Sequence, residues 1–240
     1  MNNQSKANQT VKTQKRYTVT ILAYPGMTML DAIGPNDILG NSEFIDLTWA
    51  STEKDPISND MKSLALSDLT YFKDISSTDV LLVPGGAGDH YVMQRTDVLA
   101  WIKQMNEQTI LTTSVCTGAL ILAKTGILRD IKSCSHWACL DELKKLGAKP
   151  KRKRFVHDGK YVSSSGVSAG IDMSLYLLKK LVSKEHARDI RFAIEYFPNQ
   201  FHLFNSYTLP EFLMAKLTKR FHAIFKYARN KIIEENRHLQ

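Results

Sequence analysis

A cysteine lies where a predicted strand turns into a predicted helix. The apolar and β-branched run 110–115 leads directly into Cys116, and Thr117 begins the helical segment. A thiol at such a join lies near the free N–H groups and positive dipole end of the helix, which stabilise the thiolate and lower the thiol pKa. The turn also resembles the G-x-S-x-G elbow of hydrolases. Cys116 is therefore a candidate nucleophile, although a lone cysteine is often an inert core residue.

A carboxyl group and a glycine pair follow two other predicted strands. Asp31 comes after the strand predicted over 17–24, and Gly85-Gly86 ends the strand predicted over 79–84. Because parallel strands end at one edge of a sheet, these groups are expected beside Cys116. A partly buried carboxyl has a raised pKa and can carry protons at neutral pH. Asp31 is therefore a candidate proton carrier, with a helix N-cap as its structural alternative.

Backbone N–H groups near the cysteine are candidates for stabilising negative charge on a substrate. We expect those of Gly86 and Thr117 to converge there as an oxyanion-type hole, with the Thr117 hydroxyl beside the nucleophile. A Gly-Gly pair alone indicates only a tight turn. His136, 20 residues after Cys116, is a possible accessory residue of the same cleft, and a buried structural histidine is its alternative.

Strands and helices alternate along most of the chain. Such alternation predicts an α/β fold in which a mostly parallel sheet lies between helices, with functional groups at the carboxyl ends of the strands. The segment 51–71 is expected to hold short strands or a hairpin. Strands are predicted over 17–24, 44–50, 79–84, 109–114 and 133–135, a hairpin over 155–163, and helices from about 34 and over 92–105, 117–124, 137–146, 167–182 and 184–196.

Length and composition predict one soluble domain with a tail and an extension. The chain has 240 residues, of which 43% are hydrophobic and 23% charged, and no apolar run approaches the roughly 20 residues of a membrane span. Residues 1–16 form a basic, polar segment without a secretory h-region, so we expect a disordered tail and a cytoplasmic protein. The body is predicted over 17–198. Residues 199–240 show apolar residues at helical spacing, which predicts a helical extension packed on the body or on a second subunit.

The positive charge of the chain is interpreted as a solvated surface. The net charge is +8, and a basic cluster occupies 144–154. Part of the excess lies in the tail, where Lys15 and Arg16 are expected to meet no acid. The cluster lacks the interleaved aromatic residues that stack on bases. We therefore expect no nucleic-acid partner and no membrane partner.

The cysteines and glycines also argue against metal and nucleotide chemistry. Cys116, Cys134 and Cys139 form no paired framework, which suits a reducing compartment. Two of them flank His136, but without a convincing fourth ligand this is more typical of core packing than of a metal site. No phosphate-binding glycine motif occurs in a strand-to-helix context. We expect no metal and no cofactor.

An ordered set of motifs resembles the DJ-1/PfpI superfamily over about residues 17–198. The resemblance implies a flavodoxin-like three-layer sandwich of the class I glutamine amidotransferase type, a homodimer, a nucleophile at Cys116 and no cofactor. The motifs are Tyr24-Pro25-Gly26 with Asp31 and Gly34-Pro35, Leu82-Val83-Pro84-Gly85-Gly86, Ser114-Val115-Cys116-Thr117-Gly118-Ala119, Ser135-His136-Trp137, and Asp158-Gly159 followed by Ser165-Gly166-Val167-Ser168-Ala169-Gly170-Ile171-Asp172.

Within the superfamily, the residues around the cysteine resemble the isonitrile hydratase branch. PfpI-like members have a histidine where this chain has Thr117, and DJ-1-like members have a glutamate where it has Asp31. The resemblance implies that Cys116 attacks the terminal carbon of a small isonitrile substrate, that Asp31 relays protons, and that a thioimidate hydrolyses to an N-substituted formamide. A glyoxalase-like or deglycase-like activity on reactive carbonyls, or a cysteine-based sensor of ligands or oxidants, remains an alternative. The extension and the basic cluster fit no family pattern, and about forty residues after Pro198 are too few for the DNA-binding module of related regulators.

Overall fold

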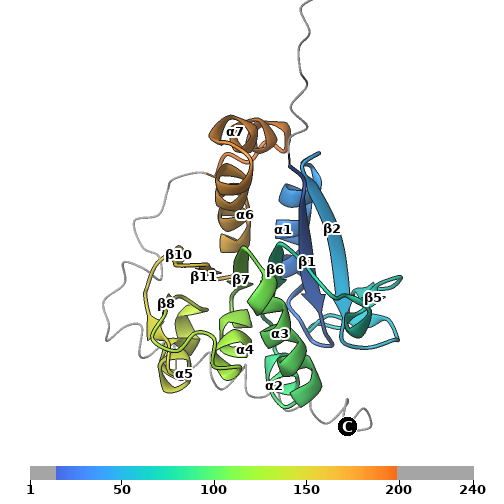
Figure 1. Ribbon diagram of the computed structural model, residues 1–240, viewed down its shortest axis with the longest axis vertical. Coiled ribbons are helices and arrows are strands. Elements are labelled where there is room, and N and C mark those ends of the chain that lie inside the picture. Colours follow the sequence, from blue (N-terminus) through green and yellow to red (C-terminus); the bar gives the residue numbers. More distant parts are fainter. Residues whose placement is uncertain (1–14, 199–240) are drawn as a thin grey trace, which may run out of the picture.

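A mostly parallel seven-stranded sheet forms the centre of the protein (Figure 1). The structure is a computed structural model, and it describes residues 15–198. The strand order is β10-β11-β7-β6-β1-β2-β5, and β10 alone pairs antiparallel to its neighbour. The predicted α/β class is thus confirmed. The strands are β1 (Tyr17–Ala23), β2 (Ile45–Ser51), β5 (Thr70–Tyr71), β6 (Val80–Val83), β7 (Leu111–Val115), β10 (Phe155–Asp158) and β11 (Tyr161–Ser164).

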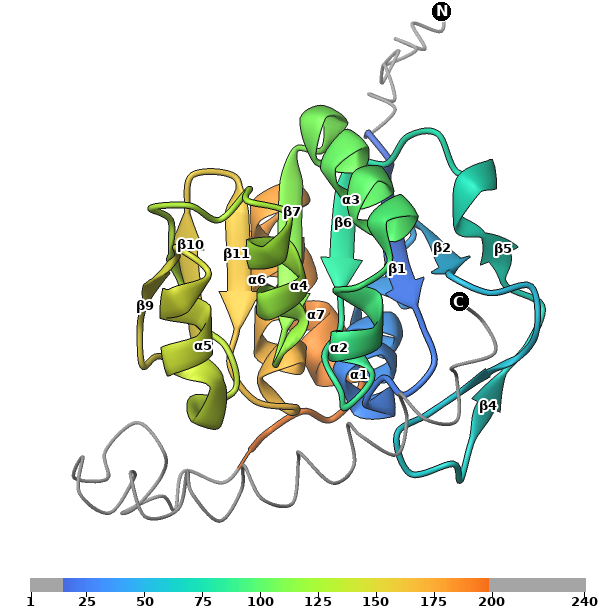
Figure 2. The ribbon, with the colours of Figure 1, turned by 90° about the horizontal axis from the view of Figure 1, so that it is seen from below.

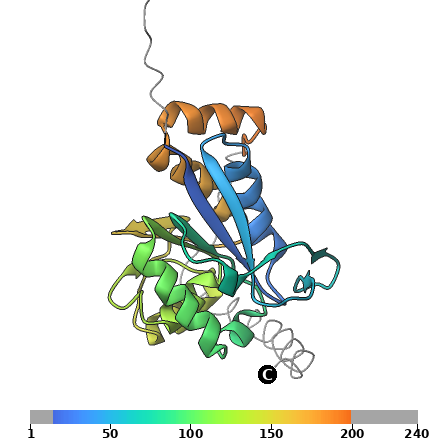
Figure 3. The ribbon, with the colours of Figure 1, turned by 45° about the vertical axis from the view of Figure 1, so that its right-hand side comes forward.

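Helices cover both faces of this sheet and complete the predicted three-layer sandwich. In Figures 2 and 3 one helical layer lies on each side of the strands. One layer contains α1 (Met29–Gly40), α6 (Ala169–Leu181) and α7 (Lys184–Ala193), and the other contains α2 (Asp89–Val92), α3 (Thr96–Gln108), α4 (Gly118–Lys124) and α5 (Leu140–Lys145).

The central strands are buried on both faces, and their order creates a crevice. Every residue of β6 and β7 is buried, as expected for parallel strands between two helical layers. The chain passes from β1 outward to β2, and later returns to place β6 on the other side of β1. Such a reversal is a topological switch point, where the carboxyl ends of neighbouring strands leave room for a ligand. The segments that follow β1, β6 and β7 therefore meet at one edge.

Two pairs of short strands and two 3-10 turns lie outside the main sheet. The expected short strands within 51–71 are β3 (Ile57–Ser58) and β4 (Ala65–Leu66), which pair antiparallel. On the opposite side, β8 (Lys132–Ser133) pairs parallel with β9 (Lys149–Pro150). Two 3-10 turns, Phe72–Asp74 and Trp137–Cys139, precede β6 and α5.

The first helix begins earlier than the sequence predicts. We expected a start near Gly34-Pro35, but α1 begins at Met29 and contains Pro35. A proline inside a helix loses a hydrogen bond and is usually costly. Here a Cβ added to Gly170 would lie 3.2 Å from Pro35 Cγ, so the proline ring packs closely on the first turn of α6. This tertiary contact offsets the local cost of the proline. Because α1 begins at Met29, Asp31 lies inside the helix.

The helix predicted over 92–105 is interrupted. Helix α2 ends at Val92 and α3 begins at Thr96, with Arg95 in an extended conformation before it. The Arg95 guanidinium donates to Glu53 at 2.7 Å and to Asp97 at 2.9 Å. These partners hold Arg95 outside a continuous helix, a long-range constraint that periodicity alone does not reveal.

Two residues of the predicted N-terminal tail are paired with acids. Arg16 forms an ion pair with Asp46, and Lys15 Nζ lies 3.8 Å from Asp79. The expectation that these two cations meet no acid was wrong, because β1 and its neighbours bring both carboxylates to the start of the sheet. The rest of the tail, 1–14, and the extension, 199–240, lie outside the described residues. Among residues 15–198, no helix is long and apolar enough to cross a membrane.

Candidate functional site

The nucleophile candidate occupies a strained elbow after β7. Cys116 has a φ of +56°, a left-handed conformation that costs a residue with a side chain on the order of 1–3 kcal/mol. Its N–H donates to Ser164 O at 3.1 Å, and its carbonyl accepts the Ser135 hydroxyl at 2.8 Å. These hydrogen bonds offset the strain. Cys116 follows directly after β7, and 6% of the residue is exposed.

A buried carboxyl group lies at this elbow. Asp31, in the first turn of α1, is fully buried, and its Oδ2 accepts the Gly85 N–H at 2.9 Å. Its Oδ1 has no partner within hydrogen-bond distance among the described residues. Burial raises the pKa of Asp31 to about 7, although the hydrogen bond from the Gly85 N–H and the nearby Cys116 thiol oppose the rise. Asp31 therefore exchanges a proton readily near neutral pH, as its sequence context suggested.

The thiol itself is not a preformed thiolate. Burial raises the pKa of Cys116 well above its usual value, and electrostatic interactions with Asp31 and Cys139 raise it further, while the Thr117 N–H lowers it. The predicted lowering of this pKa was wrong, because desolvation outweighs the N–H groups of the short helix α4. The resting site thus holds a neutral thiol beside a carboxyl group that can accept its proton.

Glycines allow three backbone segments to approach at this point. A Cβ on Gly85 would collide with Thr117 N and lie 2.9 Å from Asp31 Oδ2. Gly86 has a φ of +133°, and a Cβ there would meet the 26–28 backbone. The glycine pair therefore does more than form a turn, because any side chain at Gly85 would separate the carboxyl group from the elbow.

The predicted oxyanion donors have different surroundings. The Gly86 N–H donates to Thr117 Oγ1 at 3.0 Å, and its expected role as an oxyanion donor to a substrate stays a prediction. The Thr117 hydroxyl competes for this amide because the loop after β6 packs directly on the elbow. The Thr117 N–H, by contrast, is directed at the Cys116 sulfur. Thr117 thus couples the glycine loop to the nucleophile.

His136 has a local structural contact. Its Nδ1 accepts the Ala138 N–H at 3.3 Å and caps the 3-10 turn, and its ring lies 5.2 Å from that of Trp137. These contacts are structural, as in the alternative stated for this histidine, but the residue is half-buried rather than buried. A chemical role for His136 stays a prediction.

Two further residues support the site without having been assigned a role from the sequence. Ser135 holds the Cys116 carbonyl, and Tyr24 is fully buried with its hydroxyl donating to Pro84 O at 2.9 Å. Both occur in the motifs that carry the family resemblance. Their function was not visible, however, because it depends on backbone carbonyls that are distant in sequence.

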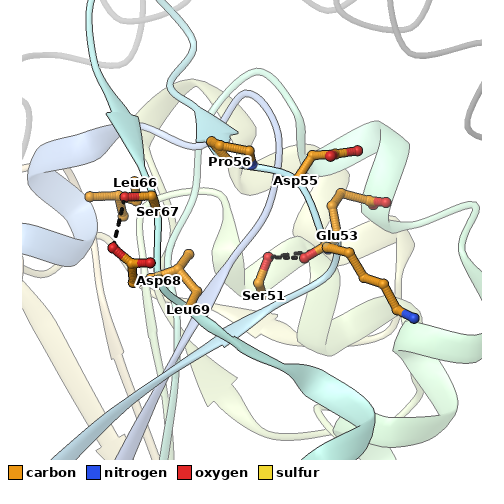
Figure 4. A pocket seen from close by; sticks show the side chains of 9 residues that line it. Ser51, Glu53, Asp55, Pro56, Leu66, Ser67, Asp68 and Leu69 are labelled. Carbon is orange, nitrogen blue, oxygen red and sulfur yellow. Dashed lines mark hydrogen bonds between the residues drawn. The ribbon is translucent and has the colours of Figure 1, made fainter.

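Cys134 has a hydrogen-bond partner of its own, and a separate hollow lies away from this chemistry. Cys134 donates its thiol hydrogen to Ser163 O at 2.9 Å, and no group of three or more histidine, cysteine or acidic residues in 15–198 could hold a metal ion. A hollow of about 270 Å³ lies between segments 51–56 and 66–69 (Figure 4). None of the predicted site residues lines it.

Comparison with known proteins places this geometry in a family. The model of the DJ-1/PfpI family matches residues 17–180, which include the Asp31, Gly85 and Cys116 segments. The chain belongs to the DJ-1/PfpI family. A solved THiJ/PfpI family protein from Pseudomonas syringae superposes with a TM-score of 0.82 at 28% identity, covering 97% of each chain.

Curated relatives of this DJ-1/PfpI protein include an enzyme and a regulator. It is 34% identical to the isonitrile hydratase of Pseudomonas putida over 180 residues, which is 75% of this chain and 78% of that enzyme. It is 30% identical over 120 residues to the HTH-type transcriptional regulator GbdR of Pseudomonas aeruginosa, but that match covers 49% of this chain and 31% of the regulator. The more extensive similarity is therefore to the hydratase.

Proposed function

We propose that this DJ-1/PfpI protein hydrates isonitriles to N-substituted formamides, with Cys116 as nucleophile and Asp31 as proton carrier. One observation carries the proposal: the buried Cys116 thiol lies beside a fully buried carboxyl group, that of Asp31, whose pKa is about 7. The extensive similarity to an isonitrile hydratase supports this choice of substrate class.

The first step forms a carbon–sulfur bond. The Asp31 carboxylate takes the proton from the Cys116 thiol, and the sulfur attacks the terminal carbon of R–N≡C. Asp31 then gives the same proton to that carbon, which yields the thioimidate R–N=CH–S–Cys116. Because the thiol is neutral at rest, general-base activation rather than a standing thiolate supplies the nucleophile.

The second step consumes water. The Asp31 carboxylate takes a proton from a water molecule, whose oxygen attacks the thioimidate carbon, and gives that proton to the nitrogen, which forms R–NH–CH(OH)–S–Cys116. Asp31 then takes the hydroxyl proton as the C–S bond breaks and passes it to the sulfur, which releases R–NH–CHO and restores the thiol. The balance is one isonitrile and one water to one formamide, and a carboxyl group that ionises near pH 7 suits both directions of transfer.

The assembly and setting of the protein belong to the same proposal. We infer a cytoplasmic homodimer that acts on a small molecule without a resident cofactor and without a nucleic-acid or membrane partner. Sedimentation of the full chain at micromolar concentration tests the dimer, for which a single species of twice the chain mass is expected. A purely monomeric species would contradict it.

The two alternative functions have less support. A carbonyl-directed activity could use the same pair, but the curated relative that is 34% identical over 75% of this chain is a hydratase. A sensor of oxidants needs an exposed, low-pKa thiol. Cys116 is buried, and its pKa is raised.

Direct turnover tests the proposal. Purified protein with an aryl isonitrile in H₂¹⁸O is expected to give the formamide carrying one labelled oxygen, detected by mass spectrometry. The variant Cys116→Ala, with its fold checked by circular dichroism, is expected to give none above the uncatalysed rate. Formamide production by that variant, or none by the wild-type protein, would reject the proposed reaction.

A further inference from the structure

Three large apolar side chains are exposed at the edge of the sheet that holds the site. Leu30 is 46% exposed and directly precedes Asp31 in α1, while Met61 and Leu64 are 78% and 58% exposed in the loop between β3 and β4. We call these three residues the rim patch. Exposed apolar side chains that gather in one place mark surfaces on which another segment or molecule docks.

Hydrogen bonds hold the two parts of the rim patch next to each other. The Asp60 N–H donates to Met27 O at 3.0 Å, and the Thr28 hydroxyl donates to the Asp60 carboxylate at 2.6 Å. Met61 follows Asp60 in the chain, and Leu30 lies two residues after Thr28. The β3–β4 loop and the first turn of α1 therefore present one surface.

The described chain ends on the same side of the molecule. The Tyr196 hydroxyl donates to Asp172 Oδ1 at 3.1 Å in the first turn of α6. In that turn, Ile171 Cγ1 lies 3.1 Å from the position of a Cβ added to Gly34, and Leu30 Cδ1 lies 3.7 Å from it. Figure 2 shows the chain after α7 ending at the edge to which the parallel strands point. The segment after residue 198 therefore starts close to the rim patch.

The sequence after residue 198 supplies an apolar surface of its own. The segment 199–240, which lies outside the described residues, has seven apolar residues at helical spacing, and the pattern predicts that they form one stripe. An amphipathic helix is stable mainly when its apolar side packs on other residues. The first of the seven comes 15 residues after Pro198, a length that spans up to about 50 Å and so reaches the rim patch. The stripe consists of Leu213, Leu217, Phe221, Ile224, Phe225, Ala228 and Ile232.

Net charge favours the rim patch over the basic cluster as the docking surface of this segment. The segment 199–240 contains seven lysines and arginines and three glutamates. The segment 51–69, which includes Met61 and Leu64, contains four acidic residues and two lysines, whereas the basic cluster 144–154 contains no acid. Opposite net charges attract and like charges repel over about a Debye length. The positive segment is therefore drawn toward 51–69.

We propose that residues 199–240 dock on the rim patch of their own chain, with the apolar stripe against Leu30, Met61 and Leu64. Docking within one chain follows from the starting point of the segment, because a short linker gives the two surfaces a high effective concentration. The docked segment covers apolar side chains that water otherwise contacts. This inference goes beyond the proposed function and does not depend on it.

Photo-cross-linking of the full chain tests the contact. With p-benzoylphenylalanine in place of Met61, irradiation is expected to link position 61 to peptides from 199–240, identified by mass spectrometry after digestion. The same replacement of Ile110, which is 43% exposed directly before β7 at the opposite edge, is the matched control and is expected to give no such link. An equal mixture of ¹⁴N- and ¹⁵N-labelled protein is expected to give linked peptides of a single isotope.

Paired variants of the stripe make the test specific. Phe221→Asp/Phe225→Asp places two charges on the stripe and is expected to lower the yield of the link from position 61 by about tenfold or more, because docking would bury them. Ala223→Asp/Asn230→Asp adds the same charge on the opposite side of the predicted helix and should keep the yield. Circular dichroism of each variant checks that the body keeps its fold.

The results either support docking within one chain or overturn it. Single-isotope links from position 61 to 199–240 that only Phe221→Asp/Phe225→Asp removes would support it. Mixed-isotope links would show that a second copy covers the rim patch. Absence of a link, or equal yields from positions 61 and 110, would show that the segment does not dock there, and equal losses in the two double variants would show that the stripe does not make the contact. Each of these three results overturns the proposal.

Discussion

Two buried cysteines of this protein differ in what receives their hydrogen. Burial raises both pKa values, that of Cys134 to about 12 and that of Cys116 well above its ordinary value. Cys134 donates to the carbonyl of Ser163, a group that cannot take up the proton. Cys116 lies beside the Asp31 carboxyl, which can.

The comparison shows that a high resting pKa does not by itself make a thiol inert. Cys116 lies beside a base, has a strained backbone directly after β7, and is slightly exposed. Cys134 has a neutral partner and no exposure. The neighbour that accepts the proton, rather than the standing fraction of thiolate, therefore separates the candidate nucleophile from the structural thiol.

The largest expected effect comes from exchanging the sulfur for oxygen at each cysteine. Cys116→Ser should lower isonitrile turnover by more than about 1,000-fold, because a hydroxyl is a far weaker nucleophile. Cys134→Ser should keep most activity, since a hydroxyl can still donate to Ser163 O. Steady-state kinetics with both variants measures this difference. Comparable losses of turnover at the two positions would show that the two cysteines do not differ in function.

The next effect concerns the base. The kcat/KM of the wild-type protein should rise with pH through an apparent pKa near 7, because ionised Asp31 takes the thiol proton. Asp31→Asn should lower kcat/KM by about 10²- to 10⁴-fold and remove this rise of kcat/KM with pH. Asp60, whose negative charge raises the pKa of Asp31, offers the control. Asp60→Asn should stay active, and its kcat/KM should rise over a lower pH range than that of the wild type. If kcat/KM of Asp31→Asn still rose with pH near 7, another group would be the base.

The same substitution should also change stability with a defined sign. The pKa of Asp31 rises from 3.8 to about 7 on folding, so its burial lowers the free energy of unfolding progressively as pH rises from about 4 to 7. Asp31→Asn should therefore be more stable than wild type at pH 8, by at most about 4 kcal/mol, and the gain should shrink toward pH 4. Urea unfolding at both pH values measures this, and a pH-independent difference would contradict it.

The smallest expected effect separates a glycine that touches the site from one that does not. Gly85→Ala should destabilise the protein by about 1–3 kcal/mol and impair turnover, because its Cβ would meet Thr117 N and the Asp31 carboxyl. Gly40→Ala, at the end of α1 with no atom within 4 Å of an added Cβ, should be neutral or slightly stabilising. Thermal unfolding and turnover of both variants provide the measurement. Equal stability and turnover of the two variants would mean that the loop after β6 moves to accept a Cβ at Gly85.

Much of the fold was predictable because its signals are local. The wholly apolar segment of β6 and the strand-to-helix pattern around β7 indicated buried parallel strands, and the Asp158-Gly159 turn indicated the β10–β11 hairpin. The start of α1 and the break before α3 were not predictable. They depend on Pro35 packing against Gly170 and on Arg95 reaching Glu53, and neither pair is close in sequence.

The candidate site divides in the same way. Residue types and their positions after strands were enough to select Asp31, Gly86, Cys116 and Thr117, because parallel strands must end at a common edge. The protonation state of the Cys116 thiol could not be predicted from the sequence, since it depends on how completely the surrounding layers exclude water. The acceptor of the Gly86 N–H likewise depends on a side chain from a different strand end.

The sequence by itself determined the strand and helix alternation, the elbow at Cys116 and the set of polar groups at the sheet edge, because each follows from short-range patterns of residue type. Only the tertiary structure decided that the thiol rests protonated beside a carboxyl group of pKa about 7, and that exposed apolar side chains from two distant segments meet at the same edge. Desolvation and charge proximity are properties of three-dimensional packing, and they vary with distances that the order of residues does not specify.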